Sequence, residues 1–235
     1  MKLIKKLLLK ILLIIILALI LVGGFFAYKG YLLYKTALEE TPISKKVEQL
    51  KADKNYVALD DVPDDFINAV ISVEDHRFYE HGAIDIISIL RAIFTNVKNG
   101  ELSEGGSTIT QQLCKNIYFT QKKEATRKFA EIFMGIQLEK ELSKDDILEL
   151  YINTNYYGSG FYGLKEASYG YFNKAPNKLN LYECTLLAGV PNAPSVYAPT
   201  KNPDLAAQRQ VQVVNAMIKY NYLSESERKE ALSNT

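Results

Sequence analysis

The first strong pattern along the chain is an apolar run near its N-terminus. Residues 11–28 carry no charge and consist mainly of Ile, Leu, Val, Phe and Ala. Together with the leucines at 7–9, the run is long enough to cross a bilayer, which takes about 20 mostly apolar residues in a helix. We therefore predict a basic cytoplasmic tail and a transmembrane anchor over residues 1–28.

The lysines before this run predict its direction. Lys2, Lys5, Lys6 and Lys10 form a basic flank, and such flanks stay on the cytoplasmic side. The chain after about residue 29 is then expected on the extracytoplasmic side of the cytoplasmic membrane. A cleaved signal peptide is the alternative. No A-x-A-like cleavage pattern follows the run, and the run is long for such a peptide, so we favour a retained single-pass anchor.

Beyond the anchor, the apolar positions form short stripes at helical spacing. Residues 29–54 mix lysine with small and acidic residues and are expected to form a linker or stalk, followed by one domain over 55–235. The periodicity and the capping signals predict helices near 66–73, 85–99, 108–116, 122–142, 143–154, 164–172 and 181–189, after Pro203, and from Ser224. No stretch alternates with period two for long enough to require a sheet, so the predicted fold class is mainly α.

One of these stripes is especially apolar. Asp85 is expected to cap its helix, which should end at Asn99 and Gly100. The apolar positions 86, 87, 90, 93, 94 and 97 share one face of that helix. We interpret this face as part of the core, and a membrane-facing role is the less favoured alternative.

The composition argues against several classes of function. The formal net charge is +1, which gives no electrostatic case for a nucleic-acid partner. Cys114 and Cys184 are too few and too far apart for a disulfide framework or a C-x-x-C metal site. We expect two buried thiols, and a single bridge between them stays open.

A dense polar stretch, SVEDHRFYEHGAID, covers residues 72–85 and contains both histidines of the chain. Zinc sites of the H-E-x-x-H type place their histidines four residues apart, whereas His76 and His81 are five apart. Consecutive Glu74, Asp75 and His76 cannot converge on one ion from a helix or a strand. We therefore predict no metal ligands here. An acid–base role requires a carboxylate in a cleft and partners from elsewhere in the chain.

Two further polar segments supply such partners. EGGSTITQQLCKN, residues 104–116, places glycine backbone and hydroxyl groups before a helix N-terminus, an arrangement that binds anions, although an ordinary capped helix explains it as well. In QKKEATRKFAEIF, residues 121–133, Lys123, Arg127 and Glu131 follow one another at intervals of four and share a helix face. A solvated, salt-bridged face is the alternative.

Taken in order, these segments resemble one enzyme family. EDHRFYEHGAID, GGSTITQQLCKN, RKFAE, KDDILELYINTNYYGSGFYG, LAGVPNAPSVYAPTKNP and QRQVQVVNAM are similar, in sequence and order, to the peptidoglycan glycosyltransferases of glycosyltransferase family 51. The resemblance covers about residues 55–220. Two positions depart from it. Arg209 is followed by Gln210 where a second arginine is expected, and the basic residue expected before RKFAE is a lysine, Lys123 or Lys122.

The resemblance implies a fold and a reaction. The fold is a lysozyme-like, bilobal helical domain preceded by one N-terminal transmembrane helix. The reaction polymerises lipid II, an undecaprenyl-diphosphate disaccharide-peptide, into β-1,4-linked glycan strands with inversion and release of undecaprenyl diphosphate. The implied partners are lipid II, the nascent strand, the bacterial cytoplasmic membrane, and penicillin-binding proteins or other wall-synthesis proteins.

The resemblance also assigns roles to residues. Glu74 is the general base. Glu131 is the second acidic residue of the catalytic site, and either orients the basic residues or helps to hold a divalent cation, Mg or Mn, on the diphosphate. No organic cofactor is expected. The residues expected to bind the substrate and its diphosphate are Ser107, Gln112, Lys115, Lys123 and Arg127.

Other functions stay open as alternatives. A lysozyme-like lytic enzyme would cleave glycan, but the basic residues and the anchor argue against it. A non-catalytic scaffold for cell-wall proteins would need neither Glu74 nor Glu131. We expect the monofunctional form rather than a bifunctional penicillin-binding protein, because only six residues follow the S-x-x-K string at Ser226–Lys229. A fragment of a longer bifunctional protein is the alternative to that expectation.

Overall fold

The computed structural model describes residues 2–100, 105–119 and 125–233. Within these ranges the chain forms α-helices and short 3-10 turns, with no strand beyond one isolated bridge between Tyr156 and Tyr162. The predicted mainly α fold class is therefore confirmed.

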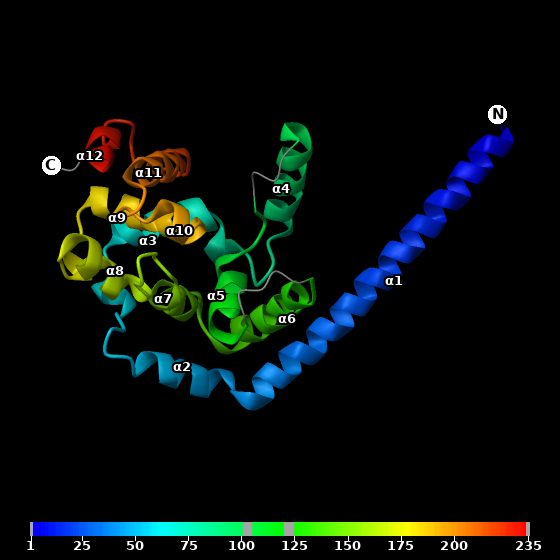
Figure 1. Cartoon of the computed structure of the whole chain (residues 1–235), viewed down its shortest axis with the longest axis horizontal. Helices are drawn as coiled ribbons and strands as arrows, with labels where there is room; N and C mark the ends of the chain where they lie inside the picture. The colour runs from blue at the N-terminus through cyan, green and yellow to red at the C-terminus, as the bar shows by residue number, and fades with distance from the viewer. Residues whose placement is uncertain (1, 101–104, 120–124, 234–235) are drawn as a thin grey trace.

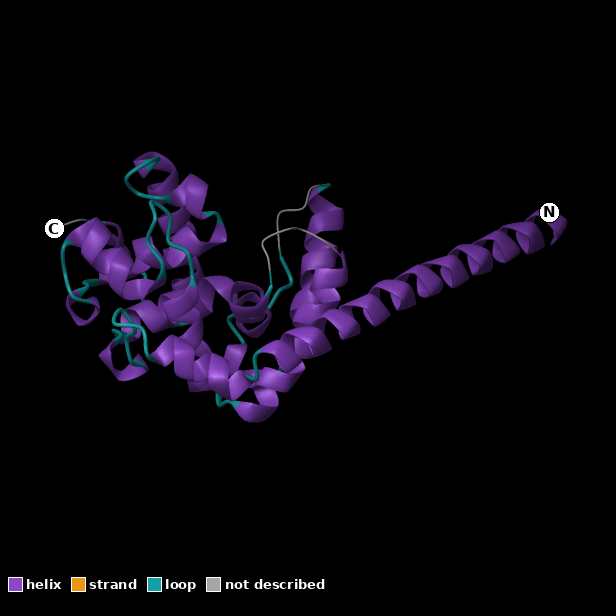
Figure 2. Ribbon diagram, turned by 60° about the horizontal axis from the view of Figure 1, so that its bottom comes forward, coloured by secondary structure: helices purple, strands orange, loops and turns teal. Residues whose placement is uncertain are grey.

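The N-terminal part of the longest helix, α1 (Lys2–Glu40), extends away from the other helices, while its C-terminal part packs on α6 (Ala125–Glu141) (Figures 1 and 2). Among the described residues α1 is the one helix that is long and apolar enough to cross a membrane. Its large apolar side chains between Ile4 and Val22 are exposed, so no part of the described protein covers them. These properties fit a membrane anchor, and the side on which the domain lies stays a prediction.

Residues 29–54, for which the sequence predicts a linker or stalk, are largely helical. α1 continues to Glu40, and α2 (Ile43–Lys51) follows directly after Pro42. Ile43 is buried in the core, and the carbonyl of Thr41 accepts a hydrogen bond of 3.2 Å from the hydroxyl of Tyr118. This segment is therefore packed against the folded body. The division of the chain into domains stays a prediction.

The core lies among α3 (Asp64–Glu74), α5 (Ile109–Tyr118), α7 (Lys144–Thr154), α9 (Leu181–Gly189) and α11 (Pro203–Lys219). Helices α3, α9 and α11 pack on one another, while α5 packs on α7 and on α6 (Ala125–Glu141). The remaining elements are α8 (Gly163–Phe172), α10 (Pro194–Tyr197), α12 (Arg228–Leu232) and the 3-10 turns Leu59–Asp61, Phe78–Glu80, Pro176–Lys178 and Val190–Asn192. Cys114 and Cys184 are free and buried, as expected.

Helix α4 (Ile86–Asn99) departs from the prediction. Asp85 caps it and Gly100 ends it in a left-handed conformation, both as expected. The six apolar side chains of the predicted stripe are 55% to 79% exposed, however, and the helix stands apart from its neighbours (Figure 1). The interpretation of this stripe as core is wrong. Periodicity shows that one face of a helix is apolar, but not what covers that face.

Candidate active site

Glu74 is the last residue of α3 and lines a cleft of about 410 Å³. Its Oε2 accepts a hydrogen bond of 2.8 Å from Nε2 of Gln112. Its Oε1 is buried without a hydrogen-bond partner, and the guanidinium of Arg209 lies 3.7 Å away, an ion-pair distance too long for a hydrogen bond. Burying a polar atom without a hydrogen-bond partner costs free energy, so few such atoms occur in folded proteins. Oε1 of Glu74 is therefore an acceptor that is available to a group bound in the cleft.

Other walls of the same cleft are cationic. Lys115 comes from α5, and Arg127 and Lys128 come from the start of α6. Burial lowers the pKa of Lys115. The negative charge of Glu131 opposes this shift, and the positive charge of Arg127 adds to it. Three cations converging on one cavity are a natural binding site for a polyanion.

Glu131 is 3% exposed and lies among these cations. Arg127 pairs with its Oε1, and Nζ of Lys128 is 3.2 Å from its Oε2. Lys128 also donates hydrogen bonds to Oγ of Ser107, at 2.7 Å, and to Oε1 of Gln111, at 2.8 Å. Glu131 therefore offsets the repulsion between two neighbouring cations and holds both in place.

Most of the site residues predicted from the sequence lie together. Those that line the cleft are Glu74, Ser107, Gln112, Lys115, Arg127 and Glu131. Lys123 lies outside the described residues. Sequence reasoning missed Lys128, although its position three residues before Glu131 was a usable signal for a pair on a helix. It also missed Arg209 as a neighbour of Glu74, because no local spacing connects residues so far apart in the chain.

The cleft continues on both sides of this centre. Glu74 and Asn192 also line a cavity of about 370 Å³, together with Arg209, Gln212 and Tyr220. Lys115 and Asn192 line a further cavity of about 340 Å³. Glu74 thus lines two of three adjoining cavities rather than a single closed pocket, which suits a long substrate.

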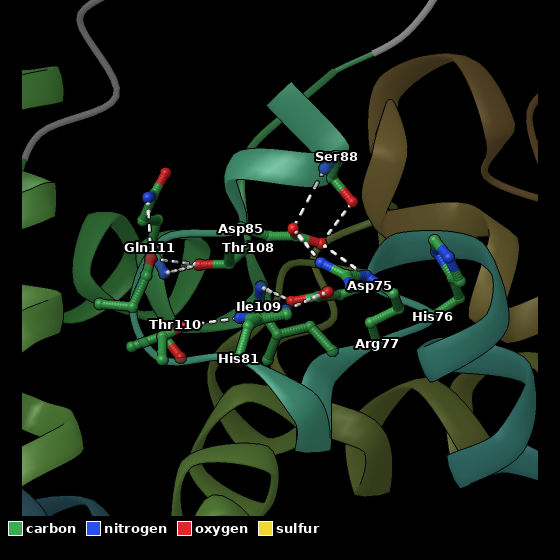
Figure 3. A network of polar contacts seen from close by, with 12 residues as sticks. Asp75, His76, Arg77, His81, Asp85, Ser88, Thr108, Ile109, Thr110 and Gln111 are labelled. Carbon is green, nitrogen blue, oxygen red and sulfur yellow. Dashed lines mark hydrogen bonds and ion pairs between the residues drawn. The ribbon is translucent and has the colours of Figure 1, made fainter. Parts of the chain in front are cut away.

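A second polar cluster begins at the next residue, Asp75, which is 6% exposed (Figure 3). Its Oδ2 accepts a hydrogen bond of 3.1 Å from the backbone N–H of Ile109. Its Oδ1 lies 2.7 Å from Nε2 of His81, whose Nδ1 lies 2.6 Å from the carbonyl of Gly82. Burial lowers the pKa of His81, but the hydrogen bonds to Asp75 and Gly82 outweigh burial and raise it overall.

Asp75, His81 and Asp85 each place one metal-ligand atom within 4.8 Å of the other two. These atoms are already engaged in contacts within the protein. Asp85 accepts hydrogen bonds from the hydroxyl of Ser88 at 2.5 Å and from its backbone N–H at 3.1 Å, and it pairs with Arg77. These contacts outweigh burial and hold the pKa of the Asp85 carboxyl well below its usual range. We therefore interpret this cluster as structural support for the chain around Glu74.

The same support reaches the start of α5. The hydroxyl of Thr108 and the side-chain amide of Gln111 both donate to the carbonyl of Ala83, at 3.0 and 2.9 Å (Figure 3). Thr108 also accepts from the backbone N–H of Gln111 and so caps α5. These contacts fix the helix that carries Gln112 and Lys115 relative to the segment that carries Glu74.

A carboxylate with an oxygen free of hydrogen bonds, set beside a cationic cleft on a helical scaffold, is an arrangement typical of group-transfer enzymes. The family model described as transglycosylase matches residues 40–218. The chain therefore belongs to the transglycosylase family, and the predicted enzyme class, peptidoglycan glycosyltransferase, is confirmed at the level of the family.

Several named proteins are similar to this chain. Penicillin-binding protein 1A of Neisseria flavescens is 42% identical over 76% of this chain and 22% of its own length. A candidate transglycosylase of Cupriavidus necator is 43% identical over 74% of each chain. The crystal structure of penicillin-binding protein 1A from Haemophilus influenzae gives a TM-score of 0.45 at 23% identity, covering 77% of this chain and 17% of that one. The chain thus spans about a fifth of the length of the penicillin-binding proteins that it matches.

Proposed function

We propose that this domain polymerises lipid II into β-1,4-linked glycan strands. One observation carries the proposal: the Glu74 carboxylate, with an oxygen free of hydrogen bonds, shares a cleft with Lys115, Arg127 and Lys128. A glycosyl transfer from a sugar diphosphate needs a base at the acceptor and positive charge at the leaving group, and this cleft supplies both.

In the proposed reaction Glu74 takes the proton from the 4-hydroxyl of the acceptor sugar. The hydroxyl oxygen attacks the anomeric carbon of the growing chain, and the bond from that carbon to the diphosphate oxygen breaks. The electron pair of that bond leaves with undecaprenyl diphosphate, and the configuration inverts from α to β. Gln112 orients the base through its hydrogen bond of 2.8 Å.

The cations of the cleft bind the departing diphosphate. Lys115 and Arg127 supply charge directly, and Glu131 keeps Arg127 and Lys128 aligned. The diphosphate is already a good leaving group once its charge is neutralised, so no acid is required to protonate it. This distinguishes the proposed reaction from glycan cleavage, in which a carboxylic acid must protonate a poor leaving group.

The described side chains do not form a ready site for the divalent cation that the resemblance allows. Both oxygens of Glu131 are already paired with cations, and Glu74 offers a single free oxygen, which faces the guanidinium of Arg209 at 3.7 Å. We therefore route no step of the mechanism through a metal ion. Parallel assays with and without a chelator test this assignment, and full activity in the chelator is the expected result.

We further propose that α1 anchors the domain on the outer side of the bacterial cytoplasmic membrane. The apolar exposed length of α1 and the lysines at its start support this placement. Lipid II, with its lipid tail in the same bilayer, then meets the groove at the membrane surface. The nascent strand is the second substrate, and wall-synthesis proteins are the proposed partners.

The test is an assay of the full chain in detergent micelles with labelled lipid II. We expect long glycan strands and one undecaprenyl diphosphate for each bond formed. The same preparation is incubated with purified sacculi as the comparison. Release of muropeptides from sacculi, without strand formation from lipid II, would establish the lytic alternative instead.

A further inference from the structure

Two opposite faces of helix α6 make different contacts. Arg127, Lys128 and Glu131 lie on the face that borders the cleft. The opposite face packs along α1, and this is the most extensive pairing between any two described helices. The ring of Phe133 on α6 contacts the ring of Tyr31 on α1, with their centroids 5.5 Å apart. The helix that carries Arg127 and Lys128 thus packs on α1.

The two helices approach each other tightly at Gly30. This residue is buried in a helix whose other nearby positions are mostly exposed. A Cβ atom added there would lie 2.5 Å from Cβ of Phe129, 2.8 Å from the backbone oxygen of Thr126 and 2.9 Å from the backbone nitrogen of Ala130. Two of these three atoms are backbone and cannot move aside without moving α6 itself. Only glycine allows this separation.

The turn that Gly30 contacts is the one that carries the cations. Thr126 and Ala130 are the two ends of a helical turn, and Arg127 and Lys128 lie between them. Any shift of this turn away from α1 changes where both cations lie relative to Glu74, which belongs to a different helix, α3. Protein interiors are close-packed, so such a shift is transmitted rather than absorbed.

We propose that Gly30 is a positioning residue for the glycosyl transfer, and that α1 sets the distance between the α6 cations and Glu74. This inference rests on the proposed function, because it concerns the placement of the diphosphate-binding residues. Helix α1 is then part of the catalytic scaffold as well as an anchor, and its packing on α6 controls the rate of the reaction.

The chain supplies a matched control on the same helix. An added Cβ at Gly24 would meet no atom within 4 Å, so Gly24→Ala makes the same chemical change without contacting α6. Both substitutions also raise the intrinsic helix propensity of α1 by a similar amount. A difference between Gly30→Ala and Gly24→Ala therefore reports the contact with α6.

The experiment compares wild type, Gly24→Ala and Gly30→Ala as full chains in detergent micelles with lipid II. We expect Gly30→Ala to lower kcat/KM by about 10- to 100-fold, mainly through kcat, because small displacements of catalytic groups have effects of this size. Gly24→Ala should match wild type, and both variants should be fully folded at the assay temperature, although overpacking at Gly30 lowers the unfolding midpoint of Gly30→Ala. Activities of the two variants within twofold of each other would overturn the inference. A loss of activity no larger than the unfolded fraction of Gly30→Ala at the assay temperature would overturn it too, since Gly30 would then be merely structural.

A second readout is independent of the reaction. Amide hydrogen exchange in residues 125–141 should be faster in Gly30→Ala than in Gly24→Ala, because the α6 turn at Gly30 is displaced. Equal exchange in the two variants contradicts the coupling, whatever the activities. If wild type does not use lipid II at all, the proposed function fails, while the exchange comparison still decides whether Gly30 positions α6.

Discussion

Glu74 and Asp75 are adjacent in the chain, yet their carboxylates lie in opposite surroundings. Glu74 has one oxygen without a hydrogen-bond partner and lines the cationic cleft. Asp75 has both oxygens engaged, by the backbone of Ile109 and by His81. The helix ends between them: Asp75 has left α3, with φ of −161° and ψ of 73°, so the two side chains diverge.

This difference assigns a catalytic role to Glu74 and a structural role to Asp75. A general base needs a carboxylate oxygen that is free to accept a proton, whereas a structural carboxylate needs hydrogen bonds to both of its oxygens. Changes in the cleft should therefore lower activity and leave stability nearly unchanged. Changes in the Asp75 cluster should lower stability first.

Removing the half-buried cation of the cleft, Lys115, should have a large effect on activity. We expect Lys115→Ala to lower kcat for lipid II by about 10²- to 10³-fold, the size seen when one electrostatic contact to a transition state is removed. The measurement is strand formation by the purified variant, beside its free energy of unfolding. Lys201→Ala, at an exposed position, is the control. Wild-type kinetics in Lys115→Ala would remove this residue from the diphosphate site.

The more exposed cation should matter less. Lys128 has a side chain that is 43% exposed, and Glu131 keeps Arg127 as a partner when Lys128 is lost. We expect Lys128→Ala to lower kcat/KM by about tenfold, because solvent screens the charge that is removed. Steady-state kinetics over a range of salt concentrations check this prediction. An effect as large as that of Lys115→Ala would contradict the assigned order of the cations.

Substitutions in the polar cluster around Asp75 should change the stability of the protein. Asp75→Asn replaces an acceptor-only carboxylate with an amide that cannot accept from both Ile109 and His81. We expect it to lower the free energy of unfolding by about 1–3 kcal/mol, the cost of leaving a buried group unsatisfied. Denaturant unfolding measures this. Unchanged stability together with lost activity would place Asp75 in the chemistry and break the comparison.

The smallest predicted effect is a pH dependence at His81. Its pKa is raised in the folded state above the ordinary value of 6.5. The protonated histidine therefore contributes stability that is fully present below about pH 6.5 and is lost as the pH rises through the raised pKa. The difference in unfolding free energy between wild type and His81→Asn should shrink across that interval. A difference that grows with pH would reverse the assigned sign.

The sequence predicted the helices well because their signals are local. Asp85 and Ser143 cap α4 and α7 through contacts three residues away, as their spacing indicates. Residues that approach from distant segments were harder to predict. Arg209 lies near Glu74 only because α11 packs on α3, and no local pattern encodes that packing.

The exposure of α4 and the contact at Gly30 show the same limit. The apolar stripe of α4 predicted a buried face, but burial depends on whether a partner helix is present, which periodicity does not show. Gly30 lies in an apolar helix with two other glycines, Gly23 and Gly24, and nothing in the sequence separates the three. Only the packing of α6 on α1 distinguishes Gly30.

The most direct test of this account is the use of lipid II by the Glu74→Gln variant. The substitution keeps the shape of the side chain and an acceptor for the amide of Gln112, but removes the base. We predict a loss of strand formation of at least about 10²-fold, the typical contribution of a general base, with an unfolding free energy equal to that of wild type. Substantial polymerisation by the folded variant would contradict the assignment of Glu74 as the base.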